Sequence, residues 1–188
     1  MMSDDPTRLD AAAAQLPAGA HLLLAEHVLD TLGTALRRER TVAERALVQL
    51  EAADWHARLD PESNTVAVLV QHLAGNLRSR WTDFLTTDGD KPGRDRDGEF
   101  AITDAAPEAL MAAWDEAWET LLATLEALTP ADLMRTVTIR GEPHSVVQAI
   151  VRALGHTAQH VGQVLLLAKH LRGEAWQTLS IPTPKRGG

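Results

Sequence analysis

Two histidines four residues apart, His156 and His160, stand in the last long apolar stretch of the chain. In an α-helix a four-residue step leaves both side chains on one face, about 6 Å apart along the axis, so both imidazoles can reach one metal ion. Zinc peptidases with the H-E-x-x-H motif use this spacing, but the residue after His156 is Thr157 and their glutamate base is missing. The spacing therefore predicts a metal-binding pair and excludes that class of peptidase.

A third histidine, His72, is predicted to point inward like this pair. His156 and His160 continue an apolar stripe of their helix, and His72 continues another in an earlier helix. Three neutral imidazoles can bind a divalent first-row metal and leave a position open for water or substrate. The alternative is that each is an interior histidine that hydrogen-bonds to a carbonyl or a neighbouring side chain.

The surroundings of the triad give weaker signals. Ligating imidazoles usually donate their second N–H, and the candidates to accept it are Asn76, Gln159 and Gln163. No carboxylate is placed beside the triad by spacing, so no catalytic residue is named. The other five histidines fall near predicted helix ends or outside an inward stripe: His21, His27, His56, His144 and His170.

Two further groups of residues have both a functional and a structural interpretation. Arg78 and Arg80 could steer an anionic substrate, but an exposed helix face is the favoured interpretation. Glycines inside predicted helices make room beside the metal or allow close helix packing, and packing is preferred; they are Gly75, Gly155 and Gly162.

Composition narrows the class of protein. The 188 residues fit one domain, and 18 Lys and Arg against 26 Asp and Glu give a net charge of −8, which disfavours nucleic acid and anionic lipid as partners. With no cysteine, disulfides and sulfur-ligated zinc sites are excluded. The N-terminal segment is acidic and lacks a secretory signal pattern, and no apolar run is long enough to span a membrane, so a cytoplasmic location is expected.

Helical periodicity predicts four long helices around this triad. They cover about 22–50, with Gly33 as a candidate break, then 65–86, 107–129 and 146–171, the last starting at a Ser145–Gln148 capping box. A polar connection spans 87–103, and residues 88–98 are a candidate lid over the site. A short extended piece covers 136–140, and the apolar tail is expected to pack as a strap. We expect an all-α four-helix bundle with a long crossover over residues 21–188, after a low-complexity extension at 1–20.

Three segments together resemble the DinB/YfiT-like superfamily, in a branch without established function. They are NTVAVLVQHLAGNLRSRWTDFLTTDGDKPGRDRDGEF, IRGEPHSVVQAIVRALGHTAQHVGQVLLLAKHL and the closing WQTLSIP, and the likeness covers roughly Leu29 to Pro182. The resemblance implies a four-helix bundle with a long crossover, frequent dimerisation, and a metal triad at positions that match His72, His156 and His160. Related branches include thiol-dependent transferases and a mycothiol-dependent isomerase.

Residues and resemblance together favour a metal-dependent enzyme. Zinc or nickel on the triad would activate water or a low-molecular-weight thiol, for transferase or hydrolase chemistry on a small molecule. A homodimer is expected, with neither nucleic acid nor membrane as partner. The alternative is a non-catalytic bundle that binds metal or a small ligand in a stress-response or sensor role, or whose metal only joins two helices.

Overall fold

The computed structural model describes residues 19–180, which are mostly helical. Most of the extension predicted over 1–20 lies outside this range, and Ala20 already belongs to a helix. Four helices are long, and they are α2 (Ala20–Leu47), α3 (Val66–Trp81), α5 (Pro107–Ala127) and α6 (Val146–Arg172). The other elements are the short α4 (Arg96–Glu99), strands β1 (Thr136–Ile139) and β2 (Glu142–Ser145), and the 3-10 turns Ala52–His56, Pro130–Asp132 and Gly173–Ala175.

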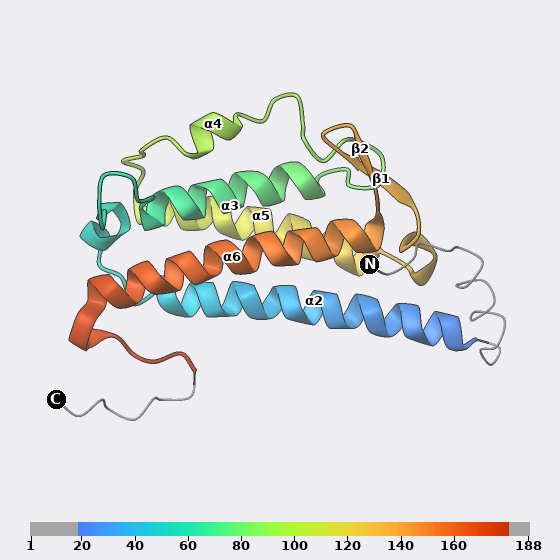
Figure 1. The fold of residues 1–188 in the computed structure, drawn as a ribbon, viewed down its shortest axis with the longest axis horizontal. Coiled ribbons are helices and arrows are strands. Elements are labelled where there is room, and N and C mark those ends of the chain that lie inside the picture. Colours follow the sequence, from blue (N-terminus) through green and yellow to red (C-terminus); the bar gives the residue numbers. More distant parts are fainter. Residues whose placement is uncertain (1–18, 181–188) are drawn as a thin grey trace, which may run out of the picture.

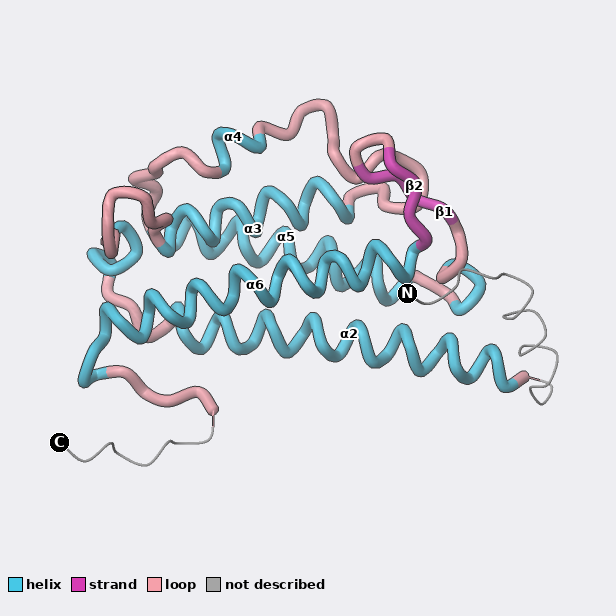
Figure 2. Tube along the Cα trace, in the orientation of Figure 1, coloured by secondary structure: helices cyan, strands magenta, loops and turns pink. Residues whose placement is uncertain are grey.

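The long helices lie side by side in two packed pairs, α3 against α5 and α2 against α6, with further contacts between the pairs (Figure 1). Helices α3 and α5 run in one direction, and α2 and α6 run in the other. Two consecutive long helices, α3 and α5, can run in the same direction only because residues 82–106 return along the length of α3. This crossover carries α4, and the β-hairpin lies at the end where α3 stops and α6 begins (Figures 1 and 2).

Local sequence signals determine where three of these helices begin. The Thr65 hydroxyl accepts a hydrogen bond from the Val68 amide at the start of α3. Pro107 occupies the first turn of α5, where its missing N–H costs nothing. Ser145 and Gln148 form a reciprocal capping box at the start of α6. These three starts were predicted within one residue and are confirmed.

Two predicted helix features are wrong. Helix α3 ends at Trp81 and not near 86, because Thr82 is extended and Asp83 takes a left-handed backbone with φ 48°. The following residues form a turn on the Asp83 carbonyl and not another helical turn. Helix α2 continues without a break through Gly33, which is buried, so packing offsets the cost of about 1 kcal/mol for a helical glycine.

The extended piece predicted over 136–140 is β1, and it pairs antiparallel with β2, which was not predicted. A two-residue turn joins the strands, and both of its residues have positive φ, 58° at Arg140 and 75° at Gly141. The Asp88 carboxylate accepts hydrogen bonds from both of their amides, at 2.9 and 2.8 Å. The crossover therefore fixes the hairpin at its turn.

The core is formed by inward apolar faces of the four long helices and includes the fully buried Trp114 and Trp118. Trp176 and Leu179 of the tail pack on this core, which confirms the predicted strap as far as residue 180. Across the helices that the structure describes, none combines the length and the apolar character needed to cross a membrane.

Candidate metal centre

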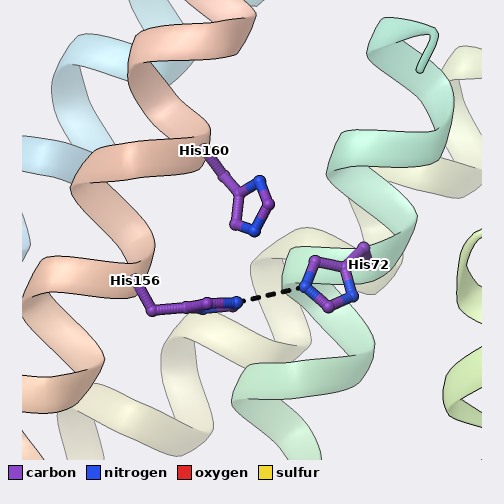
Figure 3. A group of neighbouring side chains, drawn as sticks. All are labelled: His72, His156 and His160. Atoms are coloured by element: carbon purple, nitrogen blue, oxygen red, sulfur yellow. Dashed lines mark hydrogen bonds between the residues drawn. The ribbon is translucent and has the colours of Figure 1, made fainter. Parts of the chain in front are cut away.

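The three predicted histidines converge between α3 and α6 (Figure 3). His72 comes from the middle of α3, while His156 and His160 come from successive turns of α6 and point toward it. One donor nitrogen from each ring can be chosen so that all three lie within 4.8 Å of one another. The Nε2 atoms of His72 and His156 are 3.2 Å apart.

This donor set fits a metal ion. Two nitrogen ligands about 2.0 Å from one zinc ion are about 3.3 Å apart at the tetrahedral angle. The 3.2 Å separation of the two Nε2 atoms is close to that value. Neutral imidazoles suit zinc, nickel and other divalent first-row ions. The three residues can thus hold a metal, although their geometry does not choose among these ions.

A buried glutamate orients His72. The Nδ1 atom of His72 lies 3.0 Å from Oε2 of Glu99, and both side chains are buried. An ionised carboxylate can only accept a hydrogen bond, so Nδ1 carries the proton and the Nε2 lone pair faces the other two rings. Glu99, which lies in the crossover, therefore accepts the second N–H of His72. The sequence had predicted an amide side chain for this function.

Arg94 keeps Glu99 ionised. Its Nε and Nη2 atoms each lie 2.7 Å from one Glu99 oxygen in a bidentate pair, and its Nη1 lies 3.1 Å from Asp90. Burial by itself raises the pKa of Glu99, but the hydrogen bonds from Arg94 and His72 outweigh it and lower the pKa below its usual range. Hydrogen bonds between side chains therefore connect Arg94 to Glu99 and Glu99 to His72.

Three contacts hold the crossover against α3 at this point. The Gln71 amide donates to the carbonyls of Gly98 and Glu99, both at 3.1 Å. The Phe100 ring lies 4.2 Å from the His72 ring. A Cβ at Gly75 would overlap the Glu99 carboxylate, so this glycine lets α4 pack closely on α3, which confirms the preferred packing interpretation for it. Gly155 and Gly162 have no neighbour among the described residues within 4 Å of the Cβ position, so close packing is wrong for these two.

On the α6 side, the Nδ1 atom of His160 lies 2.7 Å from Oε1 of Gln163. Burial, followed by repulsion from His160 and His72, lowers the pKa of His156 to about 4. Burial also lowers the pKa of His160. Near neutral pH these imidazoles are uncharged, which is the form that binds metal.

The triad lies at the wall of a cavity of about 520 Å³ between α3, α6, the crossover and β1. Asn76 and Gln159 line this cavity, and no hydrogen bond joins them to the three histidines among the described residues. Gly89, Arg96 and Phe100 from the crossover also line it, so the candidate lid forms one of its walls. The cavity thus has the volume of a typical small-molecule site and adjoins the three imidazoles.

The predictions for the other histidines and for Arg78 and Arg80 have different outcomes. The five other histidines lie outside the triad. Arg78 is exposed as expected, but Arg80 is buried and lines the cavity, so its assignment to an exposed face is wrong. Gly89 and Asp90 of the crossover lie against the Arg80 side chain at the end of α3 and contribute to its burial.

Sequence reasoning missed Glu99 and Arg94, because both lie in an aperiodic polar segment. One signal was available. Phe100 is the only aromatic residue between 87 and 103, and an aromatic side chain in a polar connection indicates where that connection docks on the core. The residue before it is Glu99.

The family of this chain follows from its sequence match. A model for a family described as a protein of unknown function, DUF1572, matches residues 24–185. The chain belongs to this family. No curated protein gives a significant match to it. The function of this family is unknown, so the family match assigns no activity to the site.

Proposed function

We propose that this member of the DUF1572 family is a metal-dependent enzyme that acts on a small molecule, with His72, His156 and His160 as ligands of one zinc or nickel ion. One observation carries the proposal: three convergent imidazoles, one fixed by a buried carboxylate, lie at the wall of an open cavity of about 520 Å³. Three protein ligands beside open space are typical of catalytic sites, whereas structural sites are closed.

The proposal assigns a separate function to each group of residues around the triad. The Arg94–Glu99 pair holds the tautomer and orientation of His72, and Gln163 does the same for His160. When bound, the ion lowers the pKa of a coordinated water or thiol and so supplies a nucleophile near neutral pH. No Asp, Glu or Lys from the described part of the chain lines the cavity. A nucleophile that needs no protein base, such as a low-molecular-weight thiol, suits this lining best.

The proposal includes a wider relationship. We place the chain in the DinB/YfiT-like superfamily of four-helix bundles, supported by the four long helices, the long crossover and the histidines on α3 and α6. Transferase chemistry with a thiol, or hydrolysis with water, follows from that placement. A cytoplasmic homodimer without nucleic acid as partner completes the proposal, and sedimentation equilibrium with and without added DNA tests it.

Metal analysis tests the site directly. We expect elemental analysis of protein purified without a metal-affinity tag to give about one equivalent of zinc or nickel. His160→Ala should contain little metal, while His170→Ala, an exposed histidine at the end of α6, should match the parent. A parent that holds no metal and takes up neither added zinc nor added nickel would contradict the proposal.

Turnover tests the enzymatic part. The metal-loaded parent should convert an activated aryl halide in the presence of a low-molecular-weight thiol, or hydrolyse an activated ester, and the His160→Ala variant should not. The competing proposal is a bundle that binds metal without catalysis. It would be favoured by a cobalt-substituted protein whose visible spectrum is unchanged by added thiol or azide, since that result means a closed coordination sphere.

A further inference from the structure

The cavity beside the triad has a strongly cationic lining. Four arginines line it, and no acidic side chain from residues 19–180 does; they are Arg80, Arg96, Arg140 and Arg152. The whole chain carries a net charge of −8, so this concentration of positive charge is opposite to the average of the molecule. A cavity with one sign of charge and low-dielectric walls favours a ligand of the opposite sign.

Three of the four arginines lie at one end of the cavity. Arg80 is eight residues after His72 on α3, about 12 Å along the axis toward the hairpin. Arg152 is one turn before His156 on α6, also toward the hairpin, and Arg140 lies in the hairpin turn. The cavity thus has a metal-binding end at the triad and a cationic end at the hairpin.

Arg80 is the buried member of this group. Only 9% of it is exposed, and its Nη1 atom is buried with no hydrogen-bond partner among the described residues. Its nearest acidic contact is Asp90, whose Oδ1 lies 3.9 Å from Nη2. Asp90 is closer to Arg94 and Arg140, at 3.1 and 3.5 Å, so one carboxylate serves three guanidinium groups.

The charge on Arg80 is therefore poorly compensated. Burial, followed by repulsion from Arg94, Arg140 and Arg152, lowers the pKa of Arg80 to about 10, and the attraction of Asp90 offsets only part of this. The side chain remains a cation at neutral pH. The neighbouring Trp81 also lines the cavity, and its buried indole N–H has no acceptor in the described range. Buried donors without acceptors are rare in native proteins and indicate a missing acceptor.

The backbone holds a second arginine at this end of the cavity. Arg140 has a left-handed backbone, φ 58°, a conformation that is unfavourable for a residue with a side chain and usual for glycine or asparagine. The carboxylate of Asp88 stabilises it through the amides of Arg140 and Gly141. Gly89 lies directly on Arg80, where an added Cβ would come within 3.2 Å of the arginine side chain.

We propose that the cationic end of this cavity binds a carboxylate or phosphate group of the substrate, with Arg80 as its main contact and Arg140 and Arg152 at the rim. The claim that the anion belongs to a substrate rests on the proposed function, whereas the anion site does not. Guanidinium groups bind either oxyanion through paired N–H donors. The substrate class is a small elongated anion with its reactive group at the triad.

Direct binding of simple anions tests the site. Isothermal titration with inorganic phosphate and with succinate should show one site in the parent, and the tighter of the two identifies the preferred oxyanion. Arg80→Met should weaken that binding at least about tenfold, the loss expected when one charged hydrogen-bonding group is removed. Arg78→Met is the matched control, because Arg78 lies two residues away on the same helix, is exposed and does not line this cavity. Unfolding temperatures confirm that each variant is folded.

A metal-deficient variant separates this inference from the proposed function. Anions also bind to metal ions, so the titrations are repeated with His160→Ala. Retained anion binding in that variant, lost in His160→Ala/Arg80→Met, supports an arginine site whether or not the parent is an enzyme. Anion binding that disappears in His160→Ala and persists in Arg80→Met would overturn the inference and leave the metal site standing. Absence of binding for both anions in the parent would also overturn it.

Discussion

Arg80, at the end of α3, and Arg94, in the crossover, both have buried side chains, at 10% and 4% exposed, yet their surroundings differ. Arg94 donates two 2.7 Å hydrogen bonds to Glu99 and a third to Asp90 at 3.1 Å. Within residues 19–180, Arg80 has only the 3.9 Å approach to Asp90, and its Nη1 has no hydrogen-bond partner there. Removing a cation from water is unfavourable unless its donors are satisfied, so the described residues supply a structural explanation for Arg94 and not for Arg80. Arg94 holds Glu99 beside His72, and Arg80 lines the cavity.

Replacing each of these two arginines by methionine should have clearly different effects on the free energy of unfolding. Arg94→Met leaves the Glu99 carboxylate buried without its main partner and should lower the free energy of unfolding by about 3 kcal/mol. Arg80→Met removes a poorly compensated charge and should leave the stability unchanged or raise it by up to about 1 kcal/mol. Urea denaturation measures both. Arg37→Met, which breaks the exposed Arg37–Glu126 pair, is the control and should cost less than about 1 kcal/mol. Equal losses for the two buried arginines would show that Arg80 also has a structural function.

Alanine substitutions at two glycines test whether Glu99 controls His72. Gly75→Ala places a methyl group against Glu99 and should lower stability by about 1–3 kcal/mol and metal affinity by about tenfold, since Glu99 must move from His72. Gly155→Ala has free space and should raise stability by about 0.5–1 kcal/mol, the usual gain for alanine in a helix. Denaturation and competitive metal titration measure the two effects. A Gly75→Ala protein with parental metal affinity would show that Glu99 does not control His72.

The smallest effect concerns Asp88, which holds the hairpin turn on the cavity side. Hydrogen bonds from the Gly141, Asp90 and Arg140 amides lower the pKa of Asp88 to about 2. A carboxylate with a depressed pKa stabilises the fold above its usual pKa near 4, and this contribution is lost as the pH falls toward 2. Asp88→Asn should be less stable than the parent at pH 6, with the difference vanishing between about pH 4 and pH 2. Thermal unfolding at several pH values measures it, and a constant difference would contradict this account.

Short-range signals made much of the fold and part of the histidine triad predictable. The capping residue Ser145, the helix-starting Pro107 and the apolar periodicity act within a few residues of themselves, so they determine where helices begin and which face is buried. The four-residue spacing of His156 and His160 acts in the same way. These features depend on helix geometry, which is the same in every protein.

Only the tertiary structure determined what surrounds His72, His156 and His160. Glu99 reaches His72, 27 residues earlier in the chain, because the crossover folds back along α3, and no periodic pattern marks that return. The burial of Arg80 likewise depends on Gly89 and Asp90 of the crossover, which lie against the last turn of α3. The sequence by itself thus determined which side chains share a helix face, while the packing of aperiodic segments on those helices determined which charges are buried, paired or left facing the cavity.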